Sequence, residues 1–474
     1  MKSAELQWGG RFAHPPDPEL MAFGSSLEDD LVLAPFDVRC SLAHVSALAS
    51  GGIITASIAA ALREALQHVG SEIADHTFAT SARASGAEDI HGAIDARVRE
   101  LSGEAGEWLH AGRSRNDQVA TTLLLYARDR AAAGAATSLE IVTAMIASAN
   151  EELKAGTTIA ATTHWQPAQP TLLAFWIMAA AEPFLRAARR FKSAEKSASR
   201  FCPLGSAAVA GSTLPLGREV AAAELSFSQP SRNAIDAIGT RDVLLDTTHA
   251  FVRAVTDASR IAGELVIWCT PQFGYARLGD ASSTGSSLMP QKRNPDPFEL
   301  IRGVASEVLG AYTGAVASVI GLPLSYHRDL QQTKRLATLG IERGLAALQA
   351  FALALSDVAF VRAKMNADAD GSCTVATDVA DALILGGVSA RRAHELVGLA
   401  VTRAEKDRRP LNEADFAWLA NQAGVKAIEA PLDATASVRA KQTSGSTNPD
   451  EVVKMIRDVE AEVRSLDSAR SEKS

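Results

Sequence analysis

The segment GSSLMPQKRNPD, residues 285–296, brings together side chains that could stabilise a developing negative charge. Ser286 supplies a hydroxyl, Lys292 an ammonium and Asn294 an amide, a set suited to an anionic intermediate. A phosphate-binding P-loop would need a glycine directly before the lysine and a hydroxyl directly after it, and here glutamine and arginine occupy those places. The segment is therefore either a reactive loop or a solvated surface turn.

A second candidate site is HAGRSRNDQVAT, residues 110–121. Ser114 and Asp117 have the spacing of a capping box, which predicts that a helix begins here. Arg113 and Arg115 flank the serine, and Asn116 adds an amide. A helix N-terminus beside two arginines attracts carboxylates and phosphates, so the same residues could cap the helix and bind an anion.

Two polar segments next to prolines add further candidates. THWQPAQP contains Thr163 and His164 in an expected loop, where the histidine could transfer a proton or bind an anion, although a lone histidine is more often structural. YHRDLQQTK contains Tyr326, Gln331 and Lys334, which could recognise a polar substrate. An exposed amphipathic helix start would look the same.

A metal site is the alternative suggested by AEDIHGAID, which contains Asp89, His91 and Asp95. His91 and Asp95 would lie one helical turn apart, but the segment supplies no evident third ligand and the sequence has no H-E-x-x-H motif. We therefore expect no metal, and we expect Asp89 to cap a helix or orient a neighbour.

The bulk composition excludes several partners. A net charge of −8 on 474 residues argues against nucleic acid or an anionic membrane. No secretory signal is recognisable, and the longest apolar run is about half the roughly 20 residues that cross a bilayer. The four cysteines lie too far apart for a zinc ribbon or a disulfide framework. We expect a soluble, cytoplasmic protein.

The elements that position these segments are expected to be helices. Long stretches lack proline, and their apolar residues recur at three- and four-residue spacing, while β-type alternation is nearly absent. The sequence predicts an all-α protein with an N-terminal helical domain (1–112), a central domain of very long helices (113–363) and a C-terminal helical domain (364–474). Such long helices favour a bundle completed by other copies of the chain.

Together these segments resemble the fumarase/aspartase superfamily, whose members share a loop of the form G-S-S-x-M-P-x-K-x-N. That pattern is filled by Gly285, Ser286, Ser287, Met289, Pro290, Lys292 and Asn294. Within the superfamily the sequence is most similar to the argininosuccinate lyase family. The likeness rests on WGGRF near the start, EDIH, AGRSRNDQVAT, THWQPAQP, GLPLSYHRDLQ and ATDVADALILGGVSARRAHELVG, and is nearly full length.

The resemblance implies an all-α homotetramer with a central bundle of about twenty helices and active sites built from three chains. It implies reversible elimination of fumarate from argininosuccinate, releasing arginine without a cofactor, as a step of arginine biosynthesis. By resemblance Ser286 is the base, Lys292 and Asn294 stabilise the carbanion, and His164, oriented by Glu299, is the proton donor or charge partner. The residues expected to hold substrate are Ser26, His91, Ser114, Arg115, Asn116, Thr163, Tyr326, Gln331 and Lys334.

Several positions depart from the usual family pattern. They are Gly24, Val32, Gly92, Pro167, His327, Arg328, Gln332 and Thr333. None removes Ser286, Lys292, Asn294 or His164, so fumarate-forming elimination is better supported than the identity of the leaving amine. Two alternatives stay open: a carbon–nitrogen lyase acting on another N-substituted aspartate, and a catalytically silent structural homologue.

Overall fold

The structure is a computed structural model that describes residues 17–371 and 373–471. The WGGRF segment used in the sequence comparison lies outside the described residues. Helices dominate, and the strands form only three two-stranded sheets within the described residues. The prediction of an all-α fold is confirmed.

The chain divides into two compact units. Unit 1 comprises residues 1–135, 190–253 and 304–346, and unit 2 comprises residues 136–189, 254–303 and 347–474. Each unit is assembled from separate stretches of sequence. The predicted borders of three consecutive domains, at 112/113 and 363/364, therefore stay predictions.

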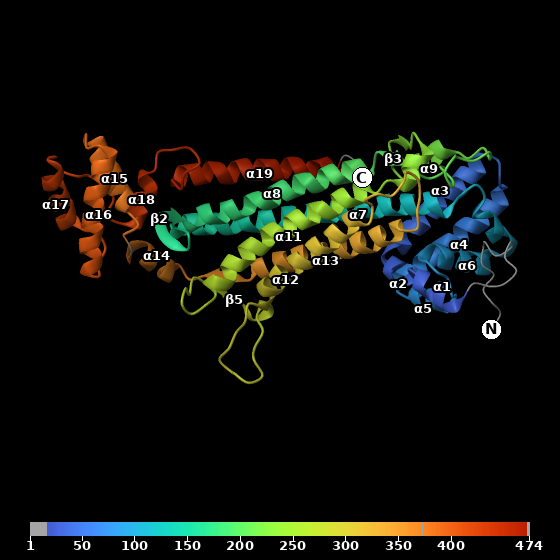
Figure 1. Cartoon of the computed structure of the whole chain (residues 1–474), viewed down its shortest axis with the longest axis horizontal. Coiled ribbons are helices and arrows are strands. Elements are labelled where there is room, and N and C mark those ends of the chain that lie inside the picture. The colour runs from blue at the N-terminus through green and yellow to red at the C-terminus, as the bar shows by residue number, and fades with distance from the viewer. Residues whose placement is uncertain (1–16, 372, 472–474) are drawn as a thin grey trace. The chain divides into compact units, whose positions relative to one another are not determined.

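Five long helices contribute one part to each unit (Figure 1). They are α7 (Arg115–Ala155), α8 (Leu173–Ala198), α11 (Asp242–Trp268), α12 (Asp296–Ala317) and α13 (Leu330–Ser356). The prediction of very long helices between residues 113 and 363 is confirmed. Ala-rich, proline-free sequence explains the 41 residues of α7, because alanine has the best helix propensity.

Close packing between these helices in unit 1 depends on two glycines. A Cβ atom at Gly134 of α7 would lie 2.8 Å from the Phe191 ring of α8, and one at Gly344 of α13 would lie 2.9 Å from Phe251 of α11. The two phenylalanines are fully buried, with ring centroids 4.6 Å apart. A glycine within a helix costs about 1 kcal/mol relative to alanine, and here the absent side chain makes room for a ring.

Unit 1 also contains shorter elements. Its helices are α1 (Pro18–Gly24), α2 (Leu27–Asp30), α3 (Ala34–Ser50), α4 (Ala56–Ala74), α5 (Phe78–Ala84), α6 (Ile90–Ser102), α9 (Arg218–Glu224) and α10 (Ala234–Gly239). Strands β3 (Phe201–Cys202) and β4 (Gln229–Pro230) pair in parallel. Helices α3, α4 and α6 pack together, because each turns small and aliphatic residues inward.

Unit 2 is built on the remaining parts of the long helices. Its aromatic core includes Phe351, whose ring lies 5.3 Å from that of Phe184 and 6.0 Å from that of Phe298. Its other helices are α14 (Arg362–Gly371), α15 (Ala376–Leu385), α16 (Ala390–Lys406), α17 (Glu413–Ala423), α18 (Ala434–Ala440) and α19 (Pro449–Ser471). Helices α15, α16 and α17 share a separate apolar core that includes Leu383, Leu396 and Leu419.

One element of unit 2 differs from the sequence prediction. The segment expected as a proline-bounded loop is an antiparallel hairpin of β1 (Thr158–Thr163) and β2 (Gln166–Leu172). Two prolines of β2 pair with residues of β1 in a register that shifts between Ala161 and Thr162. Prolines are tolerated because a two-stranded sheet has only edge strands.

Three helical stretches are long and apolar enough to cross a membrane by length and composition alone. They are Pro18–Ser50, Arg115–Ala155 and Leu330–Ser356, and half or more of each apolar window is buried inside the protein.

Candidate active site

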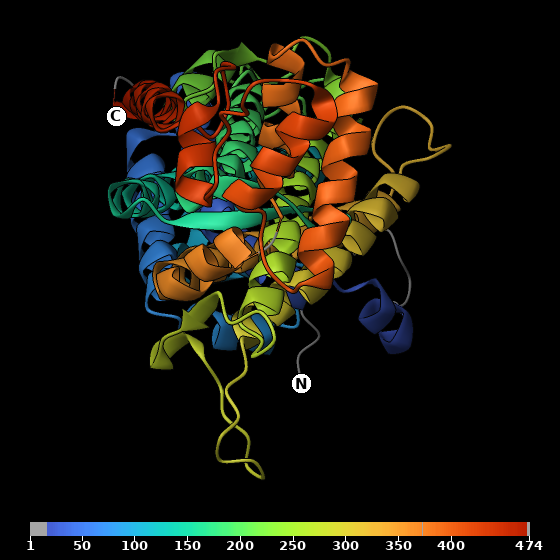
Figure 2. The ribbon, with the colours of Figure 1, turned by 90° about the vertical axis from the view of Figure 1, so that its left-hand side faces the viewer.

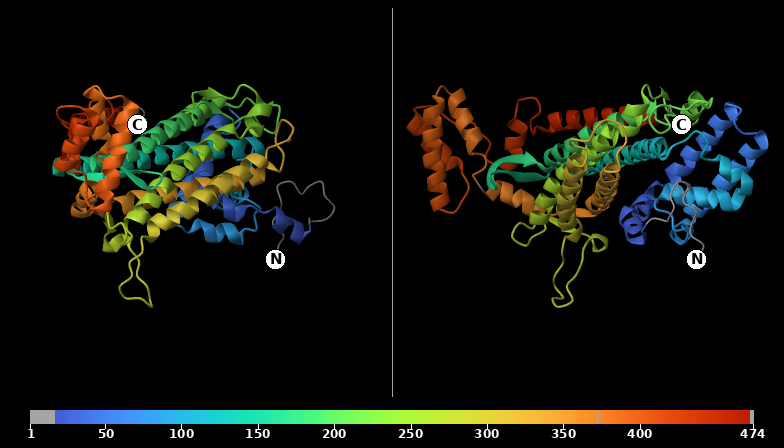
Figure 3. Two further views of the ribbon diagram at one scale, coloured as in Figure 1. Left: turned by 60° about the vertical axis from the view of Figure 1, so that its left-hand side comes forward. Right: turned by 45° about the vertical axis from the view of Figure 1, so that its right-hand side comes forward.

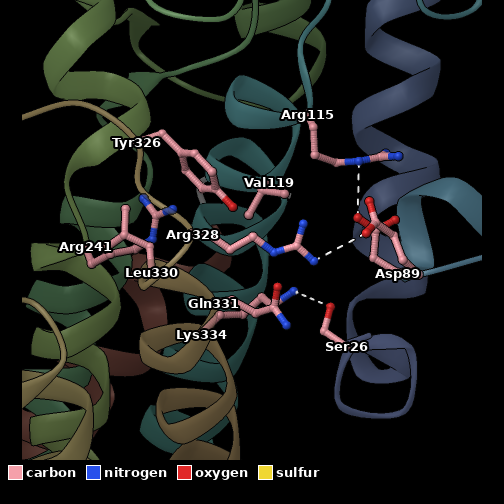
Figure 4. Close-up of a pocket in the computed structure, with 11 residues that line it drawn as sticks. Ser26, Asp89, Arg115, Val119, Arg241, Tyr326, Arg328, Leu330, Gln331 and Lys334 are labelled. Atoms are coloured by element: carbon pink, nitrogen blue, oxygen red, sulfur yellow. Dashed lines mark hydrogen bonds and ion pairs between the residues drawn. The ribbon is translucent and has the colours of Figure 1, made fainter. Parts of the chain in front are cut away.

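A pocket in unit 1 gathers side chains from five separate segments (Figure 4). These segments are the start of α2, the residues before α6, the first turns of α7, the residue before α11, and the turn that leads into α13. The pocket is lined by Ser26, Glu88, Asp89, Arg115, Val119, Arg241, Tyr326, Arg328, Leu330, Gln331 and Lys334. Five of the predicted substrate-holding residues are therefore brought together: Ser26, Arg115, Tyr326, Gln331 and Lys334.

A buried ion pair fixes one wall of the pocket. The Lys334 ammonium lies 2.5 Å from Asp30 Oδ1, and the two side chains are 7% and 0% exposed. The Ser26 hydroxyl donates to Asp30 Oδ2 at 2.7 Å and accepts a hydrogen bond from Lys334 at 3.2 Å. Asp30 thus holds two pocket residues in place without lining the pocket itself, and the buried charges compensate each other.

A second ion pair joins two lining residues. Asp89 is the N-cap of α6, accepts a hydrogen bond from Gly92 N at 2.7 Å, and lies 3.2 Å from Arg115 Nε. The expectation that Asp89 caps a helix and orients a neighbour is confirmed. Burial raises the pKa of this carboxyl, but Arg115 and His91 outweigh burial, so that its pKa is lowered and the carboxylate is charged.

The first turn of α7 is held by Asp117. Its carboxylate accepts hydrogen bonds from the backbone N–H groups of Ser114, Gly205 and Ala207 at 3.0, 2.9 and 2.8 Å. The predicted helix start is confirmed, although the Ser114 hydroxyl accepts from Asn116 N rather than from Asp117 N. Burial raises the pKa of Asp117 to about 6, against the effect of these three donors.

Tyr326 is placed by an unusually close backbone approach. A Cβ atom at Gly239, the last residue of α10, would lie 2.6 Å from Ser325 O. Ser325 itself has a positive φ of 87°, which turns the chain just before the tyrosine. Burial raises the pKa of the Tyr326 hydroxyl, so that it remains a hydrogen-bond donor at neutral pH.

His91 lies in the interior of unit 1 and does not line the pocket. Its Nδ1 is 2.8 Å from Asp37 Oδ1, which also accepts a hydrogen bond from Gln118 at 2.8 Å. Burial raises the pKa of Asp37, but His91 and neighbouring groups outweigh it and lower the pKa to about 2. Ser114 and Asn116 lie beside Arg115 at the start of α7 and do not line the pocket either.

The residues predicted to move protons belong to unit 2. Thr163 ends β1, and His164 forms the turn of the hairpin with Trp165, both with positive φ. Ser286, Lys292 and Asn294 belong to a loop that is closed at its base by backbone hydrogen bonds between Thr284 and Asn294. In the described part of the chain, no hydrogen bond or ion pair joins Ser286, His164, Lys292 and Glu299 to one another.

That loop extends away from the helices of unit 2 in each view (Figures 2 and 3). Leu288 at its tip is 84% exposed. The Ser286 Oγ accepts backbone hydrogen bonds from Met289 N at 3.0 Å and Leu288 N at 3.3 Å. Two N–H donors on one hydroxyl oxygen favour its negatively charged form.

Five charged residues in or beside the pocket were not among the predicted site residues: Asp30, Glu88, Asp89, Arg241 and Arg328. Asp89 was expected only to cap a helix or orient a neighbour. Arg328 was noted only as a departure from the family pattern. The Arg328 guanidinium donates a hydrogen bond to Gly24 O at 2.8 Å, and a Cβ atom at Gly24 would lie 3.0 Å from Arg328 Nη2. Two positions that depart from the usual family pattern are therefore in direct contact. Asp30, Glu88 and Arg241 are single charged residues without a motif. Among described residues, no group of three His, Cys, Asp or Glu is placed to hold a metal.

Comparison with known proteins identifies the family. A lyase family matches residues 10–310, and the C-terminal domain family of argininosuccinate lyase matches residues 373–439. The argininosuccinate lyase of Leifsonia xyli subsp. xyli is 37% identical over 98% of this chain and 97% of that protein.

Solved structures share the fold. The structure of EDDS lyase in complex with formate superposes with a TM-score of 0.80 at 23% identity, covering 97% of this chain and 92% of that one. Class II fumarase from Schistosoma mansoni gives a TM-score of 0.69 at 17% identity, covering 84% and 88%. By its sequence and its fold, this chain belongs to the argininosuccinate lyase family of carbon–nitrogen lyases.

Proposed function

We propose that the protein cleaves argininosuccinate reversibly into arginine and fumarate, as a cytoplasmic enzyme of arginine biosynthesis. Family membership over nearly the whole chain supports the reaction. The observation that carries the proposal is the pocket of unit 1, where Ser26, Arg115, Tyr326, Gln331 and Lys334 converge. Its mixture of cationic and anionic groups suits a substrate that carries both signs of charge.

The proposed reaction begins at the carbon next to a carboxylate of the succinyl group. A base removes a proton there, the electron pair spreads onto the carboxylate as a dianion, and the C–N bond then breaks as fumarate forms. The leaving nitrogen takes up a proton and departs as part of the arginine guanidinium. Because the hydrogen next to a carboxylate is a very weak acid, electrostatic stabilisation must supply much of the rate enhancement.

We assign the base to Ser286. The two backbone N–H groups that donate hydrogen bonds to Ser286 Oγ would stabilise the alkoxide that a serine base requires. Lys292 and Asn294 of the same loop would stabilise the dianion. His164 would serve as proton donor or charge partner, with Glu299 orienting it, and Ser114, Asn116 and Thr163 would contact the substrate. No cofactor takes part in these steps.

We further propose that the active protein is a homotetramer in which each site combines residues of three chains. The proposed substrate pocket lies in unit 1, while the half-buried Ser286 and the exposed His164 belong to unit 2. A projecting loop with an exposed tip suits a role completed by another copy of the chain. Mixing an inactive Ser286→Ala protein with an inactive Lys334→Met protein, followed by subunit exchange, should then restore activity. Persistent inactivity of verified mixed tetramers would contradict shared sites.

The direct test supplies purified protein with argininosuccinate and measures both products. Fumarate and arginine should appear in equal amounts, and a Ser286→Ala protein of unchanged oligomeric state should release neither. Turnover of another N-substituted aspartate but not of argininosuccinate would assign a different leaving amine. An absence of fumarate from every such substrate would favour the catalytically silent homologue.

A further inference from the structure

The start of α7 is tied to the interior of unit 1 through one buried glutamine. The side-chain amide of Gln118 makes two hydrogen bonds, one as donor and one as acceptor. Its Nε2 donates to Asp37 Oδ1 of α3 at 2.8 Å, and its Oε1 accepts from Arg115 Nη1 at 3.1 Å. Arg115 lines the pocket, where its Nε lies 3.2 Å from Asp89 (Figure 4). Two hydrogen bonds therefore connect a buried carboxylate to a guanidinium of the pocket.

The two partners permit only one orientation of this amide. Burial raises the pKa of Asp37, but His91 and neighbouring groups outweigh it and lower the pKa to about 2, so that the carboxylate is ionised at neutral pH and can only accept. A guanidinium can only donate. Reversing the Gln118 amide would place its oxygen against the carboxylate and its NH₂ group against the guanidinium, and both hydrogen bonds would be lost. The Gln118 oxygen is therefore fixed toward Arg115.

Asp37 joins three helices of unit 1. It lies on α3 and is fully buried, and its Oδ1 also accepts hydrogen bonds from His91 Nδ1 of α6 at 2.8 Å and from Thr122 Oγ1 of α7 at 3.3 Å. Because these groups are buried, water does not compete for their hydrogen bonds, and the low dielectric of the interior strengthens them. Asp37 is thus a fixed acceptor that orients Gln118 and, through Gln118, the side chain of Arg115.

We propose that Asp37 and Gln118 are positioning residues, which hold the Arg115 guanidinium in the orientation that binds substrate. This inference rests on the proposed function, in which Arg115 contacts the substrate, and deepens it. A free arginine side chain has many rotamers, and ordering it when a ligand binds lowers the affinity. With a hydrogen bond to Gln118 and an ion pair with Asp89, Arg115 is ordered before the substrate arrives.

The first test compares Gln118→Met with the wild-type protein in steady-state kinetics on argininosuccinate. Methionine fills the space of the buried glutamine but makes neither hydrogen bond. KM should rise by about 10- to 100-fold, because a displacement of about 1 Å can cost about 100-fold. The value of kcat should be nearly unchanged, since Arg115 is proposed to bind substrate rather than to move protons.

Thr122→Val provides the matched control, because it removes another hydrogen bond to the same Asp37 oxygen while Thr122 does not line the pocket. This variant should keep the KM of the wild-type protein. Asp37→Asn retains an acceptor oxygen for Gln118 and should stay close to wild type, whereas Asp37→Leu should resemble Gln118→Met. Equal KM values for Gln118→Met and Thr122→Val would overturn the proposal even if the Asp37 variants failed to fold.

A double variant separates positioning from a structural role. Adding Gln118→Met to Arg115→Met should lower kcat/KM little further, because Gln118 acts through Arg115 and the two losses are then not additive. The same fold loss in the wild-type and the Arg115→Met backgrounds would show that Gln118 is structural only, and would overturn the proposal.

Crystal structures separate this inference from the proposed function. In ligand-free wild-type crystals Arg115 should adopt one conformer that is hydrogen-bonded to Gln118, and in Gln118→Met crystals its guanidinium should be displaced or adopt several conformers. A wild-type guanidinium that points away from Gln118 would overturn the inference even if no Gln118 variant folded. A protein that cleaves argininosuccinate with the same KM in Gln118→Met would keep its proposed function and lose this inference. A protein that shows the expected Arg115 conformers but cleaves no argininosuccinate would do the reverse.

Discussion

The pocket of unit 1 and the reactive loop of unit 2 are organised in opposite ways. The pocket is preformed: buried ion pairs and backbone contacts hold Lys334, Ser26 and Tyr326 before any ligand is present. The loop that carries Ser286 is exposed and closed only at its base. Recognition of a charged substrate profits from preorganisation, whereas a loop that excludes water during the reaction has to move.

The largest effect is expected from the loop. Ser286→Ala should lower kcat by about 10²- to 10⁴-fold, the range for loss of a positioned acid–base group. The melting temperature should not change, because Ser286 lies in an exposed loop. Ser287→Ala is the matched control, since Ser287 is an exposed neighbour, and should retain most activity. If steady-state kinetics showed a larger loss of kcat for Ser287→Ala than for Ser286→Ala, the base would be reassigned to Ser287.

Removal of the buried charge of Asp30, which supports the pocket wall, should instead reduce stability. Asp30→Asn leaves the buried Lys334 ammonium without its counter-ion and should lower the free energy of unfolding by about 3–5 kcal/mol. Asp29→Asn breaks an exposed pair with Arg335 and should cost at most about 1 kcal/mol. Denaturant titrations of the two variants measure these losses in the free energy of unfolding. Equal losses would show that the ion pair between Asp30 and Lys334 does not hold the pocket in place.

Acidification should also act on the interior of unit 1. Burial lowers the pKa of His44 well below 6.5, and its Nε2 lies 3.0 Å from the Ala111 carbonyl oxygen. Below pH 6.5 the unfolded chain therefore binds a proton at this position that the folded chain does not, and folding stability falls as the pH falls.

The variant His44→Gln keeps a donor for the Ala111 carbonyl but cannot titrate. Relative to wild type, the free energy of unfolding of this variant should rise by about 1.4 kcal/mol for each pH unit below 6.5. Urea titrations of both proteins between pH 7 and pH 5 measure this difference. A stability gap that stays constant with pH would mean that His44 is not held neutral by burial.

The smallest stability effect is expected at the loop tip. Leu288→Ser changes a side chain that is 84% exposed, so that the free energy of unfolding should change by less than about 0.5 kcal/mol. If the loop closes over substrate, the same change should still raise KM or lower kcat. Unchanged stability together with unchanged kinetics would argue against closure through Leu288.

The sequence predicted the helices better than it predicted the pocket. Proline spacing and apolar periodicity predicted very long helices between residues 113 and 363, because both signals are local, but they did not single out α8, which contains Pro183. The segment THWQPAQP was expected as a loop because it contains two prolines, which strands tolerate only at the edge of a sheet. In the hairpin of β1 and β2 both strands are edge strands.

Ser26 was found only by family resemblance, and Tyr326 and Lys334 were also candidates from their polar segment, whereas Asp30 and Arg241 were missed. No local pattern distinguishes a buried aspartate or arginine from an exposed one. Their importance follows from contacts with residues far away in the chain, as between Asp30 and Lys334.

The glycines that admit the rings of Phe191 and Phe251 limit how this protein can be engineered. Replacing helical glycine by alanine is a standard route to heat-resistant enzymes, because alanine restricts the unfolded chain and favours the helix. At Gly134 and Gly344 the added methyl group would press on a buried ring, so that the usual gain becomes a loss. A thermostabilisation library for this enzyme should leave both positions unchanged and draw its alanines from exposed helical glycines such as Gly303 and Gly310, where a methyl group meets no neighbour within 4 Å.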